Sequence, residues 1–388
     1  MPMTSRERLL AAVNHRTPDR PAIDLASTQV TGISILAYQR LRRHLGWPDL
    51  PLKVSDAVQQ ICIPHDDMLQ RFGVDTRGLF PVTHHIDFQD HIENECLVHE
   101  DEWGFGYRRP LQDGLWYDLY RHPLSQNTLS QELIDGYSVP RGDEPRRIQG
   151  LRQQALQWRE QQFAVVLKSA CAGLLEMMIR VRGMENALTD LLLDAQNSGR
   201  LLDKILQHKL DYWRMALREL GEMVDVVAEG DDFGTQSSQL ISLATWRELI
   251  KPRQTLLIQS IRSLAPQAKI FFHSCGNIRE FLPEFIDMGI DIINPVHITA
   301  AGMNPCALKQ EFGRDLVFWG GGVDTQTTLP KGTPEQVAEE VMRNIEILGK
   351  DGGYVFNTIH NIQADVPPEN ILAMYAAVLQ KAFPYSKM

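Results

Sequence analysis

The sequence predicts an α/β protein in which the 388 residues form one (β/α)8 barrel of the TIM type. Short apolar runs, typical of strands buried on both faces, recur through the second half of the chain, and amphipathic helical segments separate most of them. Polar residues follow directly after these runs. The chain length also lies within the range that a single barrel of this kind uses.

The chain begins with a predicted helix. Thr4 and Glu7 have the spacing of a capping box, which satisfies free amides at a helix start. We interpret residues 1–20 as an N-terminal helical extension. The next segment, Ala-Ile-Asp-Leu at 22–25, favours the beginning of a strand.

Residues 80–150 are less regular than the rest of the chain. They contain Trp103, Trp116, several glycines and prolines and many charges. We expect short hairpins inserted into the barrel here, and no separate domain, so that 1–388 is a single unit. A helix is expected over 148–161.

The regular alternation begins at residue 163. The strand-like runs are 163–167, 224–228, 269–272, 290–293, 316–319 and 354–356. Between the last two, Thr333, Pro334 and Gln336 supply the start of a helix, and Gly349 is placed to end it in a left-handed conformation. Such alternation implies parallel strands. No GxGxxG fingerprint opens a unit, so a closed barrel is favoured over an open doubly wound sheet.

Composition limits the class of protein. Lys and Arg total 39 against 49 Asp and Glu, and the net charge of −10 gives no basic surface for nucleic acid. No run reaches the roughly 18 apolar residues of a membrane helix, and the first ten residues lack the core of a signal peptide. The five cysteines are odd in number and widely spaced. We therefore expect a cytoplasmic protein with reduced thiols that binds neither nucleic acid nor membrane.

A metal site is the sharpest functional hypothesis from the residues alone. His273 and Cys275 follow the run 269–272, and alternate residues of extended chain project to one side. The carboxyl ends of barrel strands meet at the rim where active sites lie, and imidazole and thiolate are preferred zinc ligands. Two ligands do not make a site, and the candidates for further donors are Glu229, Asp232, His297 and His360.

The same residues also have a structural interpretation. Cys275 could be a small buried apolar residue, and His273 a hydrogen-bonded core histidine. The acids of the segment 229–232 could orient a substrate, transfer a proton, bind metal or cap the next helix. His360 could be a ligand, a general acid or a loop anchor. Residue spacing leaves these alternatives open.

Several segments resemble proteins of the uroporphyrinogen decarboxylase superfamily. They are TSRERLLAAVNHRTPDRPAIDL near the N-terminus, LLEMMIRVRGMENALTDLL at 174–192, FFHSCGNIREFLPEFIDMGIDIINPV at 271–296, FWGGGVDTQTTLP at 318–330 and GGYVFNTIHNIQADVPPENI at 352–371. The resemblance covers nearly the whole chain in order and implies a (β/α)8 barrel. True decarboxylases of the superfamily carry an N-terminal arginine-rich segment that binds substrate carboxylates. The matching stretch here, 25–41, lacks the expected early arginines, so the chain is more similar to the methyltransferase-like branch.

That branch uses a zinc motif of the form His-x-Cys…Cys. The resemblance implies a zinc-dependent, corrinoid-linked methyltransferase, in which His360 stands at the position of the later cysteine. Zinc would keep a thiol acceptor ionised or polarise a methylated oxygen or amine. The corrinoid would be carried by a partner protein, because no Asp-x-His-x-x-Gly motif is present, and a homodimer is also implied. The resulting site has zinc ligands His273, Cys275, His360 and Glu229, catalytic residues Asp232 and His360, and pocket residues Gln236, Trp319 and Tyr354.

Two other functions stay open. The first is a metal-independent decarboxylase or lyase that acts on a smaller acid, with Asp231 or Asp232 steering a proton. The second is a binding protein that keeps the barrel without catalysis. The methyl donor is equally open among methoxylated aromatics, quaternary amines, methanol and thiols.

Overall fold

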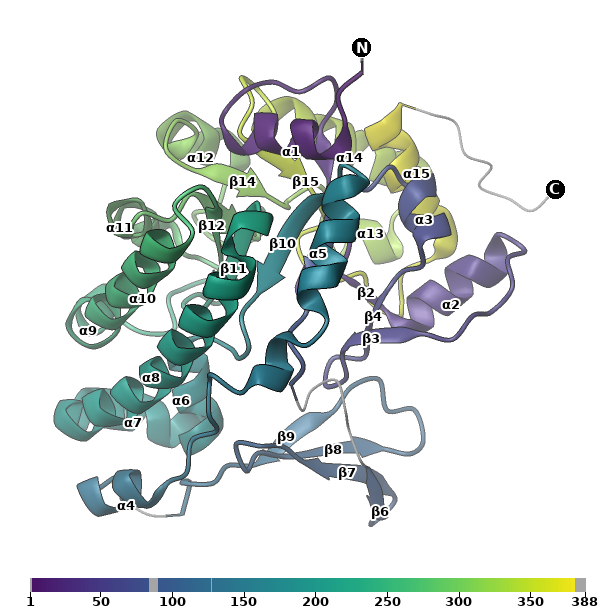
Figure 1. Cartoon of the computed structure of the whole chain (residues 1–388). Coiled ribbons are helices and arrows are strands. Elements are labelled where there is room, and N and C mark those ends of the chain that lie inside the picture. The colour runs from purple at the N-terminus through teal and green to yellow at the C-terminus, as the bar shows by residue number, and fades with distance from the viewer. Residues whose placement is uncertain (1, 84–89, 127, 381–388) are drawn as a thin grey trace.

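Eight parallel strands form the centre of the protein, in a computed structural model that describes residues 2–83, 90–126 and 128–380 (Figure 1). Neighbouring strands follow the order β1-β15-β14-β13-β12-β11-β10-β5. The predicted (β/α)8 barrel is therefore confirmed. The strands are β1 (Ala22–Ile23), β5 (Thr76–Leu79), β10 (Ala164–Lys168), β11 (Val226–Gly230), β12 (Lys269–His273), β13 (Ile292–Asn294), β14 (Val317–Trp319) and β15 (Tyr354–Phe356).

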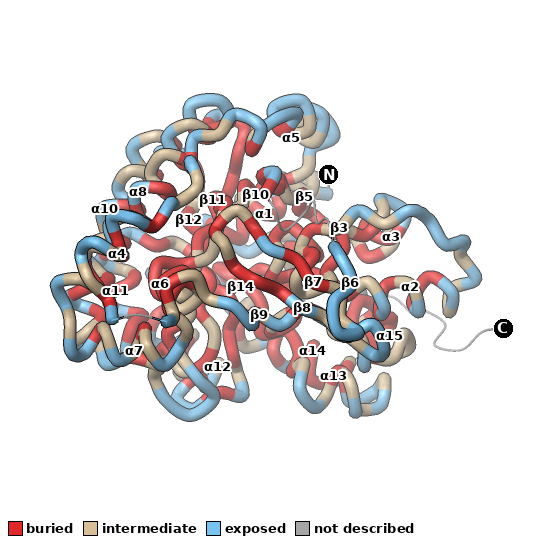
Figure 2. Tube along the Cα trace, turned by 90° about the horizontal axis from the view of Figure 1, so that it is seen from below, coloured by how far each residue is buried: buried red, intermediate tan, exposed pale blue. Residues whose placement is uncertain are grey.

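Helices surround this sheet, and their polar faces form much of the exposed surface, whereas the strands are buried (Figure 2). The first helix, α1 (Ser5–Val13), has the predicted capping box between Thr4 and Glu7. Its apolar residues pack with the inward-facing side chains of the strands. The outer helices are α5 (Leu151–Glu160), α6 (Leu174–Arg182), α7 (Met184–Leu193), α8 (Ala195–Leu220), α9 (Leu243–Thr245), α10 (Lys251–Leu264), α11 (Leu282–Met288), α12 (Pro305–Phe312), α13 (Thr328–Lys331), α14 (Pro334–Leu348) and α15 (Pro368–Leu379).

Two small antiparallel sheets are added to the barrel. One, with the order β2-β4-β3, contains β2 (Ile33–Ser34), β3 (Lys53–Asp56) and β4 (Ile61–Ile63), with helices α2 (Ile35–His44) and α3 (Asp66–Arg71) beside it. The other lies in the predicted insertion and confirms the hairpins expected there. It consists of β6 (His91–Glu93), β7 (Cys96–Glu100), β8 (Gly106–Pro110) and β9 (Asp118–Arg121), followed by α4 (Gln131–Gly136).

Asp75 closes the seam between β1 and β5, the two ends of the strand order. Its backbone N–H donates to the carbonyl of Ile23 at 2.8 Å, and its carboxylate accepts the N–H of Ile23 at 2.9 Å. Arg8 and Arg20 bind the same carboxylate at 2.7 and 2.8 Å. Because the Asp75 side chain is fully buried, the Ile23 amide and the two arginines together compensate the charge of its carboxylate.

The same arrangement recurs at two further seams. Asp225 directly precedes β11, and its carboxylate accepts the N–H of Val165 at 3.0 Å. Asp291 directly precedes β13 and accepts the N–H of Ile270 at 2.8 Å. Each carboxylate is also paired with basic side chains, which are Arg6 and Arg159 for Asp225, and Arg262 and Lys269 for Asp291.

One predicted detail is wrong. Gly349 follows the end of α14, but its φ of −81° is right-handed. The left-handed residues come later, at Asp351, Gly352 and Gly353. A side chain at Gly352 would meet the backbone of Arg16 at 2.8 Å, so the glycine is needed where the loop crosses the segment after α1. Separately, no helix among the described residues is long and apolar enough to cross a lipid bilayer.

Substitution of Asp75 tests the seam closure. We expect Asp75→Ala to lower the free energy of unfolding by about 3–5 kcal/mol, because two arginines lose their buried partner. Asp49→Ala is the control, since it removes the exposed pair with Arg43 and should cost less than about 1 kcal/mol. Urea unfolding followed by circular dichroism measures both. Equal stability of the two variants would contradict a structural role for Asp75.

Candidate active site in the barrel mouth

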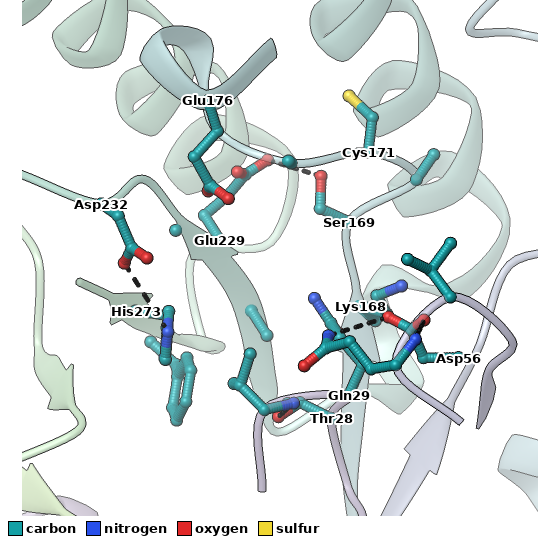
Figure 3. A pocket seen from close by; sticks show the side chains of 18 of the residues that line it. Thr28, Gln29, Asp56, Lys168, Ser169, Cys171, Glu176, Glu229, Asp232 and His273 are labelled. Atoms are coloured by element: carbon teal, nitrogen blue, oxygen red, sulfur yellow. Dashed lines mark hydrogen bonds and ion pairs between the residues drawn. The ribbon is translucent and has the colours of Figure 1, made fainter. Parts of the chain in front are cut away.

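A cavity of about 270 Å³ opens at the carboxyl ends of the strands (Figure 3). This is the rim at which the sequence predicted the site. The volume lies below the roughly 300–1,000 Å³ of pockets for drug-sized ligands, so a small molecule fits. The charged or titratable residues in its lining are Asp56, Lys168, Cys171, Glu176, Arg180, Glu229, Asp232, His273 and His360.

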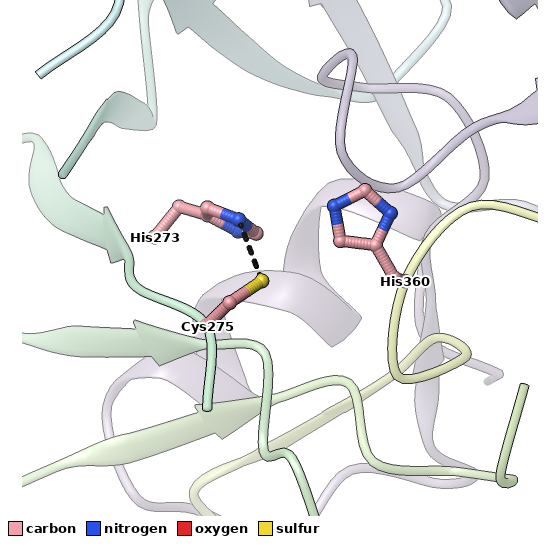
Figure 4. A group of neighbouring side chains, drawn as sticks. All are labelled: His273, Cys275 and His360. Carbon is pink, nitrogen blue, oxygen red and sulfur yellow. Dashed lines mark hydrogen bonds between the residues drawn. The ribbon is translucent and has the colours of Figure 1, made fainter. Parts of the chain in front are cut away.

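Three potential metal ligands converge at this cavity (Figure 4). His273 ends β12, Cys275 follows two residues later, and His360 comes from the loop after β15. One ligand atom from each lies within 4.8 Å of the others. His273 Nε2 and Cys275 Sγ are 3.4 Å apart. We call these three residues the triad.

Hydrogen bonds from two neighbouring strands fix the orientation of His273. The Asn294 side-chain amide donates from Nδ2 to the carbonyl of Trp319 at 2.9 Å, which leaves its Oδ1 facing His273 Nδ1 at 2.6 Å. His273 must therefore carry its hydrogen on Nδ1 in the neutral form. The lone pair of Nε2 is consequently directed toward Cys275, as a metal ligand requires.

Burial changes the protonation of the other two triad members. It lowers the pKa of His360 to about 4, and the nearby His273 adds to this effect, so the His360 imidazole is neutral near pH 7. Burial raises the pKa of the Cys275 thiol, and the charge of Asp232 adds to this. A bound cation would oppose both influences on Cys275 and favour the thiolate.

The adjacent acids Asp231 and Asp232 have different surroundings. Asp231 is fully buried and accepts the N–H groups of Leu175 and Glu176 in the first turn of α6, at 2.9 and 3.0 Å. It therefore caps a helix. Asp232 lines the cavity, accepts the N–H of Cys275 at 2.8 Å, and lies 3.7 Å from His273 Nε2.

Glu229, expected as the fourth ligand, is engaged elsewhere. Its carboxylate forms an ion pair with Lys209 at 3.0 Å, accepts a hydrogen bond from Ser169 at 3.0 Å, and accepts another from Trp213. The Lys209 and Glu229 side chains are only 1% and 2% exposed. Since both carboxylate oxygens are engaged by these partners, the structure does not bring Glu229 into the triad.

The three expected pocket residues lie outside the cavity lining. Trp319 is inside the barrel and donates from Nε1 to Asp24 at 3.0 Å. Tyr354 is buried in the main core, and Gln236 is exposed at the rim, where it bonds Gln326. His297 accepts the N–H of Gly276 at 3.1 Å and so supports the loop after Cys275.

Sequence reasoning missed two cations in the cavity, Lys168 and Arg180. Lys168 directly follows the predicted strand 163–167, so the signal that selected His273 was also present there. Arg180 lies within α6, and a position inside a helix gave no comparable signal.

The buried Lys209–Glu229 pair permits a test of its structural role. We expect Glu229→Ala to lower stability by about 3–5 kcal/mol, because the Lys209 ammonium stays buried without its counter-charge. The double variant Lys209→Met with Glu229→Leu should regain most of that loss, since neither charge remains. Chemical unfolding of the single and double variants gives the comparison. A double variant no more stable than Glu229→Ala would contradict this assignment.

Comparisons with known proteins agree with this architecture. The family profile described as Uroporphyrinogen decarboxylase (URO-D) matches residues 153–380. Uroporphyrinogen decarboxylases of Psychromonas ingrahamii and Aliivibrio salmonicida are 43% and 44% identical over 71 and 86 residues, which are 18% and 22% of this chain. The matches span 20% and 23% of those relatives, about a fifth of their length.

A solved structure also shares the fold. The structure of a methyltransferase from Methanosarcina mazei matches with a TM-score of 0.64 and 18% identity, and the match covers 97% of this chain and 99% of that one. At this identity the likeness concerns the fold alone. Because the family profile extends over more than half of the sequence, the chain belongs to the uroporphyrinogen decarboxylase family.

Proposed function

We propose that the protein is a zinc-dependent methyltransferase that works with a corrinoid carried by a separate protein. The observation that carries the proposal is the convergence of His273, Cys275 and His360 on a small cavity, with His273 held in the orientation of a ligand. The fold shared with a solved methyltransferase is consistent with it.

The triad has the chemistry and spacing that zinc requires. Zinc–nitrogen and zinc–sulfur bonds of about 2.0 and 2.3 Å in a tetrahedron place ligand atoms roughly 3.3–3.6 Å apart. The His273–Cys275 separation of 3.4 Å already fits, and His360 lies within the 4.8 Å limit, so a small movement would complete the set. Three protein ligands with one open position are typical of catalytic zinc, and both histidines line the cavity.

Each nearby group has a task in this proposal. When bound, zinc would keep a thiol ionised or make a methylated heteroatom a better leaving group. Asn294 holds the His273 ring, and Asp232 orients the Cys275 backbone. Asp232 lines the cavity 3.7 Å from His273 Nε2, and we assign proton transfer at the substrate to its carboxylate.

A carboxy-lyase is the second candidate. Lys168 and Arg180 in the cavity favour an acidic substrate, and the proton donor would again be Asp232. The small cavity and the missing early arginines favour a smaller acid than a tetrapyrrole. Release of carbon dioxide that is insensitive to a metal chelator would support this alternative.

Removal of the thiol ligand tests the methyltransferase proposal. We expect protein purified without added zinc to contain about one zinc per chain, and Cys275→Ser to retain less than about 0.2, because two imidazoles hold zinc weakly. Cys306→Ser is the matched control, since Cys306 is exposed on α12 and should leave the content unchanged. Elemental analysis gives the stoichiometry.

The same variants extend the test to catalysis. Transfer of the methyl group from methylcobalamin to a thiol, followed by the absorbance of the corrinoid, should be supported by wild type and Cys306→Ser and lost in Cys275→Ser. A wild-type protein with less than about 0.2 zinc per chain, unchanged by Cys275→Ser, would refute the metal site.

Asn294 provides a test of ligand orientation. Asn294→Ala should weaken zinc binding about 10–100-fold, because the His273 ring loses the partner that fixes its tautomer. Asn304→Ala is the control, since Asn304 caps α12 on the surface. Competition with a chromophoric chelator measures both affinities. Unchanged affinity in Asn294→Ala would show that His273 needs no such support.

A further inference from the structure

Lys168 and Arg180 line the cavity without strong partners of their own. Lys168 ends β10, and within the described residues its ammonium group makes no hydrogen bond or ion pair. The nearest counter-ion of Arg180 is Glu176, at 3.7 Å, which is longer than a hydrogen bond. Unsatisfied cationic donors in a cavity are costly unless a ligand completes them.

Two fully buried cations nearby are paired, whereas Lys168 and Arg180 are half-buried and are not paired so closely. Arg182, two residues after Arg180 on α6, binds Asp190 at 2.7 Å. Lys209, close to the same cavity, has Glu229 at 3.0 Å and the carbonyl of Ala172 at 2.9 Å. The fold therefore supplies counter-ions for its structural cations and leaves those of the cavity open.

Two carboxylates of the lining, those of Asp56 and Glu176, already accept hydrogen bonds from nearby residues. Asp56 accepts hydrogen bonds from the backbone and side-chain nitrogens of Gln59, at 2.9 and 3.0 Å, through different oxygens. Glu176 accepts the N–H of Gly173 at 3.3 Å. Burial lowers the pKa of Lys168 and Asp56 offsets this in part, so an anionic ligand would further favour the charged ammonium.

Figure 3 shows how charged groups are distributed around the cavity. Asp232 and His273 lie on one side of it, and Lys168 lies on the other, beside Asp56. A ligand that spans the cavity would meet the triad at one end and cationic groups at the other.

We propose that the substrate is a small carboxylate, whose anionic end binds Lys168 and Arg180 while its reacting heteroatom lies at the triad. The Arg180 guanidinium can bind both carboxylate oxygens, and Lys168 adds a compact positive charge. The cavity of about 270 Å³ limits this substrate to a few carbon atoms between its two ends. The inference deepens the proposed function and rests on it for the role of the triad.

A matched pair of probes tests the anionic subsite. 3-Mercaptopropanoate and its neutral amide have nearly the same size and carry the same thiol. We expect the carboxylate to bind wild type at least about tenfold more tightly by calorimetry, the effect of one charge-assisted hydrogen bond. Lys168→Met and Arg180→Met should each reduce this preference, and the double variant should remove it.

Control variants separate binding from folding. Arg152→Met removes an exposed cation outside the cavity and should leave the preference intact, and Arg180→Lys should retain part of it. Circular dichroism verifies that the variants fold. The proposal would be overturned if wild-type protein bound the two probes equally or bound neither. This outcome concerns wild type alone, so it does not depend on whether a variant folds.

The outcome also distinguishes this inference from the proposed function. Cys275→Ser should weaken the binding of both thiols, yet keep the preference for the carboxylate over the amide. A wild-type protein without zinc that still prefers the carboxylate would refute the methyltransferase and leave the subsite standing. A protein that contains zinc and binds both probes equally would refute the anionic subsite and leave the proposed methyltransferase standing.

Discussion

The buried carboxylate of Asp75 is the constraint on which the rest of the structure depends. It joins the first and last strands of the order through Ile23 and binds two arginines. Closure brings the loop after β1 beside the loop that carries His360, where Asn361 accepts the N–H of Gly32 at 2.7 Å and donates to the carbonyl of Gln29 at 2.9 Å. The cavity therefore exists because the sheet is closed.

Ionic groups divide into two sets by whether the folded chain itself supplies a close partner of opposite charge. Those that hold the barrel together are paired in the folded chain, as for Lys209 with Glu229. At the mouth, Lys168 makes no ion pair within the described residues, and Arg180 lies 3.7 Å from Glu176. Glu229 lines the cavity wall three residues before Asp232, but its pairing with Lys209 makes it a structural group, whereas Asp232 is half-exposed beside His273.

Local sequence patterns were sufficient for most strands of the barrel and for part of the site. The convergence of His273 and Cys275 followed from their spacing at a strand end, because that geometry is local. Strand β5 was missed because Thr-Arg-Gly-Leu is not an apolar run, and Gly78 is required there by the backbone of Ser27, which a side chain would meet at 2.2 Å.

The positions that sequence patterns did not predict depend on tertiary partners. Trp319 follows a strand pattern correctly, but its depth in the barrel and its bond to Asp24 depend on packing across almost the whole chain. Residue spacing also does not predict the pairing of Glu229 with Lys209 of α8. The same holds for the position of Arg180 in the cavity lining. Such contacts are set by how a helix rests on the sheet, which a pattern within one segment does not determine.

Strand register links the fold to the chemistry of the site. His273 of β12 pairs with Asn294 of β13, and Asn294 in turn donates to Trp319 of β14. A slip of one residue between these strands would turn the amide to the opposite face and release the imidazole. The tautomer of a single histidine is therefore a consequence of sheet register, and the apolar residues that fix that register are as necessary to the triad as its three side chains.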